Sequence, residues 1–176
     1  TDVGPVIDEA AKKVLDDHLK WLDKNARKIC RLKPPKEAAN GCFVPPAFYE
    51  IESLSQLDRE NFGAILHVIR FAGDELEKVV EAINTTGYGL TLGLQSRIDT
   101  VRDYVEEHAR VGNFYVNRNQ IGAVVESQPF GGEGLSGTGP KAGGPHYVAR
   151  FAIERVTCID TTAAGGNASL MASIDG

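Results

Sequence analysis

The sequence has little that would place it in a membrane, on nucleic acid or among disulfide-bonded secreted proteins. No apolar run approaches the roughly 18 residues that a membrane-spanning helix needs. The net charge is −5, whereas a nucleic-acid-binding surface is usually strongly basic. The chain has only three cysteines, an odd number at distant positions, which argues against a disulfide framework. These absences favour a cytoplasmic protein with no membrane span and no nucleic-acid contact.

The composition is that of a folded globular chain, with one local bias. Hydrophobic residues make up 42% and charged residues 24% of the 176 positions, which excludes a disordered or fibrous protein. Ten of the 19 glycines lie between Gly122 and Gly166. This bias predicts a functional loop region in the last third of the chain.

The apolar pattern predicts alternating helices and strands, as in an α/β fold with parallel strand pairing. A first helix is expected from its N-cap at Asp8 through Ile29, with basic residues near its end. The β-branched, apolar run 64–71 predicts a strand that is buried on both faces. Asp74 and Glu77 suggest a capping box on the next helix. The other expected elements are strands at 47–51, 90–94 and 114–117, a helix from Asp99, a loop at 117–145 and β structure at 147–160.

The glycine-rich loop contains a formal G-x-G-x-x-G pattern at Gly132, Gly134 and Gly137. In dinucleotide-binding proteins this pattern follows a strand and opens a helix. Here prolines lie on both sides, so no helix can begin cleanly after it. We therefore do not interpret the pattern as a Rossmann fingerprint, although its backbone N–H groups could still approach a ligand.

Other candidate chemistry is limited. Glu60 comes just before Phe62 and Gly63 at a strand entrance, where it suits a ribose-hydroxyl acceptor with a stacking neighbour or, alternatively, a solvated turn. The cysteines and histidines have no metal-ligand spacing, so we predict structural roles for them and no metal site. These residues are Cys30, Cys42, Cys158, His18, His67, His108 and His146.

Four segments, in order along the chain, resemble motifs of the aldehyde dehydrogenase superfamily. They are ENFGAIL at 60–66, with Ala64 in place of a family proline, TGYGL at 86–90, GNFYVN at 112–117 and PFGG with a following SG at 129–137. The opening residues and the run 118–145 further resemble the dehydrogenase domain of bacterial bifunctional proline utilisation A enzymes. That resemblance implies NAD-dependent oxidation of L-glutamate γ-semialdehyde, formed from 1-pyrroline-5-carboxylate, to glutamate.

The resemblance also implies roles for single residues. Glu60 would contact the nicotinamide ribose, Phe62 would pack near the nicotinamide, and Asn117 would support the active-site strand. For the substrate, backbone N–H groups of Gly122 and Ala123 would anchor its carboxylate. A further residue, Phe130, would line the aldehyde pocket.

In the family, the catalytic cysteine, the general-base glutamate and the dinucleotide-binding domain precede the matched stretch. We therefore expect no catalytic residue here and interpret residues 1–149 as the C-terminal part of an aldehyde dehydrogenase catalytic domain. Residues 150–176 would form an oligomerisation flap strand and a tail, which implies a homo-oligomer. NAD is the expected cofactor, and FAD is expected only in the proline dehydrogenase part of the parent enzyme. Two alternatives stay open: a non-catalytic binding or interaction module, and an aldehyde dehydrogenase with another substrate.

Overall fold

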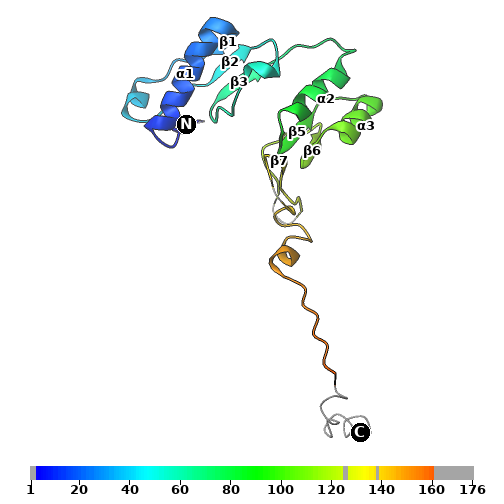
Figure 1. Ribbon diagram of the computed structural model, residues 1–176. Helices are drawn as coiled ribbons and strands as arrows, with labels where there is room; N and C mark the ends of the chain where they lie inside the picture. The colour runs from blue at the N-terminus through cyan, green and yellow to red at the C-terminus, as the bar shows by residue number, and fades with distance from the viewer. Residues whose placement is uncertain (1–2, 125–126, 138, 161–176) are drawn as a thin grey trace.

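A computed structural model describes residues 3–124, 127–137 and 139–160 (Figure 1). The chain forms two small α/β units that follow one another, and then a C-terminal arm that leaves the second unit. No helix in the described part is long and apolar enough to cross a membrane.

The first unit packs one helix against a three-stranded sheet. Its elements are α1 (Glu9–Asn25), β1 (Arg27–Arg31), β2 (Ala47–Glu50) and β3 (Ile65–Val68), with the sheet order β1-β2-β3. Strand β1 is antiparallel to β2, and β3 is parallel to β2. Residues at helical spacing on α1 are buried against the sheet because they lie on one face of the helix. They are Leu15, Leu19 and Leu22, which pack with Val44, Ala47, Tyr49, Ile51 and Ile65.

The first helix is shorter than the sequence predicts. Its start is confirmed, because the Asp8 carboxylate accepts a hydrogen bond from the Ala11 N–H at 2.7 Å. The predicted end of the helix is wrong. Helix α1 ends at Asn25, and the basic residues expected in its last turn form β1 instead. Pairing with β2 satisfies the backbone of this segment and sets Arg27 beside Glu50, with which it forms an ion pair. Tertiary pairing therefore overrides the weak preference for a longer helix.

The second unit confirms the predicted parallel pairing. Its elements are α2 (Leu76–Thr85), β4 (Tyr88–Gly89), β5 (Thr91–Leu94), α3 (Asp99–His108), β6 (Asn113–Val116) and β7 (Glu133–Gly134). Strands β5 and β6 are parallel, with Thr91 opposite Asn113, and α3 makes the crossover between them. Strand β4 pairs with β7 in an antiparallel ribbon. The α/β fold class is thus confirmed.

Two local predictions in this part of the chain are wrong. Strand β3 is not covered on both faces, because Leu66 is 58% exposed. The Asp74–Glu77 capping box does not form, since the N-cap of α2 is Glu75 and no side chain caps the helix. The Glu75 carboxylate instead pairs with Lys78 at 2.9 Å.

The C-terminal arm contains a short 3-10 helix, η3 (Val148–Phe151), where β structure was predicted. Residues 152–160 have no strand pairing and run away from the second unit (Figure 1). Several apolar side chains along the arm are mostly exposed, namely Val148, Phe151, Ile153, Val156 and Ile159. A β ladder needs a partner strand, and this chain alone supplies none within the described arm. The rest of the predicted flap and tail, 161–176, lies outside the described residues.

Candidate functional site

Glu60 and Phe62 lie on the loop that leads into β3. Glu60 is exposed and lines an open cleft of about 1110 Å³ next to α2 and β4. No side chain in the described part of the chain pairs with its carboxylate. Phe62 is 86% exposed, although it is a large aromatic residue. Gly63 packs closely on α1, because a β-carbon there would overlap the end of the Leu15 side chain. The loop thus holds an unpaired carboxylate and an uncovered ring two positions apart in the sequence.

The loop after β6 brings Gly122 and Ala123 to the surface of the second unit. Gly122 has a φ of 81°, which favours glycine. Its N–H donates to the Gln120 carbonyl at 3.1 Å, and its carbonyl accepts from the Tyr115 hydroxyl at 3.1 Å. The Ala123 N–H has no partner within the described residues. Of the two predicted donors, only that of Ala123 is therefore without a partner in the described part of the chain.

Phe130 is held between two fixed backbone groups. The Asn113 side chain on β6 donates to the Pro129 carbonyl at 3.0 Å and accepts from the Gly131 N–H at 3.1 Å. The Phe130 backbone makes two further bonds to Ala142, at 3.0 and 2.9 Å. The Phe130 side chain is half-buried.

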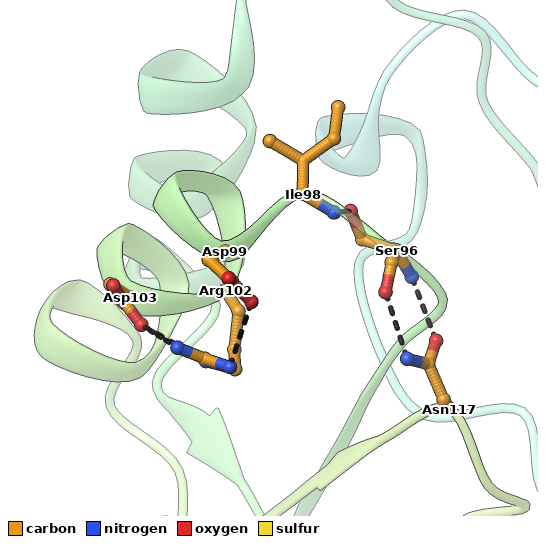
Figure 2. A network of polar contacts seen from close by, with 6 residues as sticks. All are labelled: Ser96, Ile98, Asp99, Arg102, Asp103 and Asn117. Carbon is orange, nitrogen blue, oxygen red and sulfur yellow. Dashed lines mark hydrogen bonds and ion pairs between the residues drawn. The ribbon is translucent and has the colours of Figure 1, made fainter.

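Asn117 directly follows β6, and its side chain bonds the loop before α3 (Figure 2). Its side-chain oxygen accepts from the Ser96 N–H at 2.9 Å, and its amide donates to the Ser96 carbonyl at 2.8 Å. Asn117 has a φ of 55°, a left-handed conformation that Asn tolerates better than most residues. The Ser96 hydroxyl then accepts from the Ile98 N–H at 3.1 Å, next to the start of α3. The Asn117 side chain thus continues the hydrogen bonding between β5 and β6 beyond the ends of the two strands.

Three of the four family-like segments meet in the second unit. Gly89 of β4 pairs with Glu133 of β7 and donates its N–H to the Ser136 hydroxyl at 3.1 Å. A β-carbon on Gly112 would overlap the Gly131 carbonyl oxygen, so those two backbones approach closely. The glycines of these segments are therefore explained by contact between segments that lie far apart in the sequence.

Comparison with known proteins decides the family. Residues 1–156 match the model of the aldehyde dehydrogenase family. The chain belongs to this family. It is 49% identical over 160 residues to the Bifunctional protein PutA of Klebsiella aerogenes, covering 88% of this chain and 12% of that protein. Human mitochondrial delta-1-pyrroline-5-carboxylate dehydrogenase is 36% identical over 124 residues, covering 66% of this chain and 22% of that protein.

Solved structures give the same family. A crystal structure of a proline utilization A mutant from Bradyrhizobium japonicum aligns with a TM-score of 0.85 and 54% identity, covering 93% of this chain and 16% of that one. A 1-pyrroline-5-carboxylate dehydrogenase from Thermus with bound NAD aligns with a TM-score of 0.73 and 31% identity, covering 84% and 28%. The predicted resemblance is confirmed, and the chain spans a small part of each of these aldehyde dehydrogenase relatives.

The formal G-x-G-x-x-G pattern of this aldehyde dehydrogenase chain includes strand β7 and the turn that follows it. Gly134 lies in β7 with a φ of 57°, and its neighbour Leu135 donates to the Gly87 carbonyl at 2.9 Å. No helix begins among the described residues from 133 to 147. The pattern therefore lacks the helix N-terminus that a dinucleotide phosphate would need.

The cysteines and histidines do not belong to a cluster of metal ligands within the described residues. No group of three potential metal ligands occurs there. All three cysteines are free; Cys30 and Cys158 are exposed, and Cys42 is half-buried. A hydrogen bond to Glu9 raises the pKa of the Cys42 thiol, which disfavours the reactive thiolate. His18 and His67 share a hydrogen bond between Nε2 atoms at 2.8 Å, and partial burial lowers the pKa of both.

Several residues that hold the site were missed at the sequence level. Asn113 and Tyr115 lie on β6 and bond the Phe130 and Gly122 segments, and Lys141 donates to the Gly131 carbonyl at 2.8 Å. The available signal was their alternation: two polar-tipped residues two positions apart on a strand share one face. Their partners could not be found, because they lie on loops without sequence periodicity.

Replacing Asn117 with alanine should destabilise the protein by about 2 kcal/mol. The change removes both bonds to Ser96 and leaves a residue with a β-carbon at positive φ. A matched Asn117→Gly variant loses the same bonds without the backbone strain, so it should be less destabilised than the alanine variant. Melting temperatures of the three proteins measure both effects. An alanine variant as stable as the wild type would show that this clamp is unimportant.

Proposed function

We propose that this chain is part of the dehydrogenase domain of an enzyme that oxidises L-glutamate γ-semialdehyde to glutamate with NAD. Residues 1–149 would belong to its catalytic domain. The observation that carries the proposal is the 49% identity between this chain and PutA, which extends over most of the length of this chain. The exposed Glu60 and Phe62 support it, and so does the Ala123 N–H, which has no partner within the described residues.

The residues present fit the nicotinamide half of NAD. An unpaired carboxylate can accept hydrogen bonds from ribose hydroxyls, and Glu60 has no competing partner in the described chain. Phe62 supplies an uncovered ring beside it, suited to pack near the nicotinamide. NAD, when bound, accepts a hydride from the substrate. In this proposal Glu60 and Phe62 orient the ring that receives it.

The second unit would bind the substrate. The Ala123 N–H would donate to the carboxylate at the far end of the semialdehyde, and Phe130 would form an apolar wall beside its methylene chain. The chain supplies no nucleophile in this proposal, so the covalent step belongs to the remainder of the enzyme. Proline dehydrogenase activity and its FAD would likewise belong to another part of a bifunctional parent, in the cytoplasm.

The C-terminal arm would complete a homo-oligomer. Residues 153–159 are extended and expose apolar side chains such as Ile153 and Val156. An extended segment that lies in no sheet suits strand addition to a second subunit. In this proposal the arm, together with the rest of 150–176, gains the β structure that it lacks in the single chain.

The direct test is the substrate profile of the full-length enzyme that contains this chain. We expect NAD reduction with glutamate semialdehyde and a much lower kcat/KM with propionaldehyde, which has no carboxylate. The 176-residue chain alone should show no turnover, because it lacks the nucleophile. Equal efficiency on the two aldehydes would favour another substrate class. NAD reduction by the isolated chain, or none by the full-length enzyme, would contradict the proposal.

A further inference from the structure

Asn113 and Tyr115 connect one strand to both segments that the proposed function assigns to the substrate. They are two positions apart on β6, so their side chains leave the same face of the strand. Asn113 bonds the backbone on both sides of Phe130, and Tyr115 bonds the backbone of Gly122. The two attachment points are separated by two strand residues, roughly 6.6 Å.

Tyr115 is built to hold one peptide group. The residue is only 7% exposed, and the Arg118 guanidinium lies 4.5 Å from the centre of its ring. Its hydroxyl donates to the Gly122 carbonyl at 3.1 Å. That carbonyl and the Ala123 N–H belong to the same planar peptide group, in which they point in opposite directions. By holding the carbonyl toward β6, Tyr115 therefore aims the Ala123 N–H away from the strand.

The same bond also makes the Ala123 N–H a better donor. A hydrogen bond to a peptide carbonyl polarises the whole peptide group and strengthens a bond donated from its N–H. The Ala123 N–H has no partner among the described residues, so nothing within them uses this donor. The arrangement suits an anionic acceptor that arrives from outside the loop.

Asn113 fixes the second segment by two hydrogen bonds. Its amide both donates to Pro129 and accepts from Gly131, which holds the backbone on either side of Phe130. Gly112 lets the backbones come together, since a β-carbon there would overlap the Gly131 carbonyl oxygen. Neither the Phe130 wall nor the Ala123 donor can then shift along β6 without breaking one of these bonds.

We propose that Asn113 and Tyr115 are positioning residues that set the separation between the aldehyde-pocket wall at Phe130 and the carboxylate donor at Ala123. The inference rests on the proposed function and adds its specificity determinant. A semialdehyde of one length, with a carboxylate at its far end, would reach both groups. Tyr115 serves the carboxylate end, and Asn113 serves the aldehyde end.

Tyr115→Phe in the full-length enzyme tests the carboxylate end. We expect kcat/KM for glutamate semialdehyde to fall about fivefold to tenfold, mainly through a higher KM, since a neutral hydrogen bond is lost. Efficiency with propionaldehyde should change less than twofold. Tyr104→Phe is the matched control, because the Tyr104 hydroxyl has no hydrogen-bond partner in the described chain. Asn113→Asp should lower the efficiency of both aldehydes, because Phe130 contacts the part that they share.

A second measurement does not depend on activity. Hydrogen exchange at residues 119–124, without substrate, should be faster in Tyr115→Phe than in the wild type and unchanged in Tyr104→Phe. Unchanged exchange, or equal losses on both aldehydes in Tyr115→Phe, would overturn the inference. A wild-type enzyme that does not oxidise glutamate semialdehyde would instead contradict the proposed function, and the exchange result would still decide whether Tyr115 holds the loop.

Discussion

Glu60→Gln in the full-length enzyme should weaken NAD use tenfold to a hundredfold. The substitution keeps the size of the side chain but removes the charge, and a hydrogen bond to a charged group contributes ~1.5–3 kcal/mol. The effect should be a higher KM for NAD, a lower kcat or both, because the ribose would be held less firmly. Stability should not change, since the Glu60 carboxylate makes no bond within the described residues.

Glu52→Gln provides a matched control for this prediction. Glu52 is an exposed carboxylate on the same connection between β2 and β3, so its replacement by Gln removes the same charge from the same region. It should leave the NAD titration unchanged. If Glu60→Gln also gives wild-type kcat and KM for NAD, Glu60 is the solvated turn residue of the alternative interpretation.

Local pattern predicted the elements whose partners lie nearby in the sequence. Strands β5 and β6 and the helix between them follow from apolar spacing, because a parallel pair joined by one helix is a local unit. The end of α1 could not be predicted in this way. Arg27 and Lys28 fit the last turn of a helix equally well, and only pairing of β1 with β2 decides between the two structures.

The prediction of β structure in the C-terminal arm was wrong for a related reason. Its β-branched residues, such as Ile153 and Val156, are typical of a strand, but strand structure needs hydrogen bonds from a second segment. The described chain offers no such segment to residues 152–160. The sequence therefore predicted a preference of the backbone and not a pairing.

The sequence named candidate site residues but not the contacts that hold them in place. The family-like motifs pointed to Glu60, Phe62, Gly122 and Phe130 along the chain. Nothing in the spacing indicated that the Gly122 N–H would already be bonded to Gln120. Such bonds depend on how a loop without periodicity folds back on a strand, which a single sequence does not encode in any regular pattern.

Gly122→Val should lower kcat/KM for glutamate semialdehyde tenfold or more in the full-length enzyme, with a much smaller change for propionaldehyde. At a φ of 81°, a residue with a β-carbon costs roughly 1–2 kcal/mol, so the loop should leave its conformation. The Tyr115 hydroxyl would then lose its acceptor, and the Ala123 N–H would lose its direction. Remote binding energy is what the anchor supplies, so only the carboxylate-bearing substrate should suffer strongly.

The structure separates backbone strain from a steric clash in this variant. A β-carbon on Gly122 would meet no atom of the described chain within 4 Å, so we expect the loss to come from the positive φ or from contact with the substrate. Gly73→Val is the matched control, since Gly73 also has open space around a β-carbon but no positive φ. It should leave both aldehydes unaffected. If Gly122→Val reduces the two efficiencies equally and lowers the melting temperature, the loop only shapes a turn and does not anchor the carboxylate.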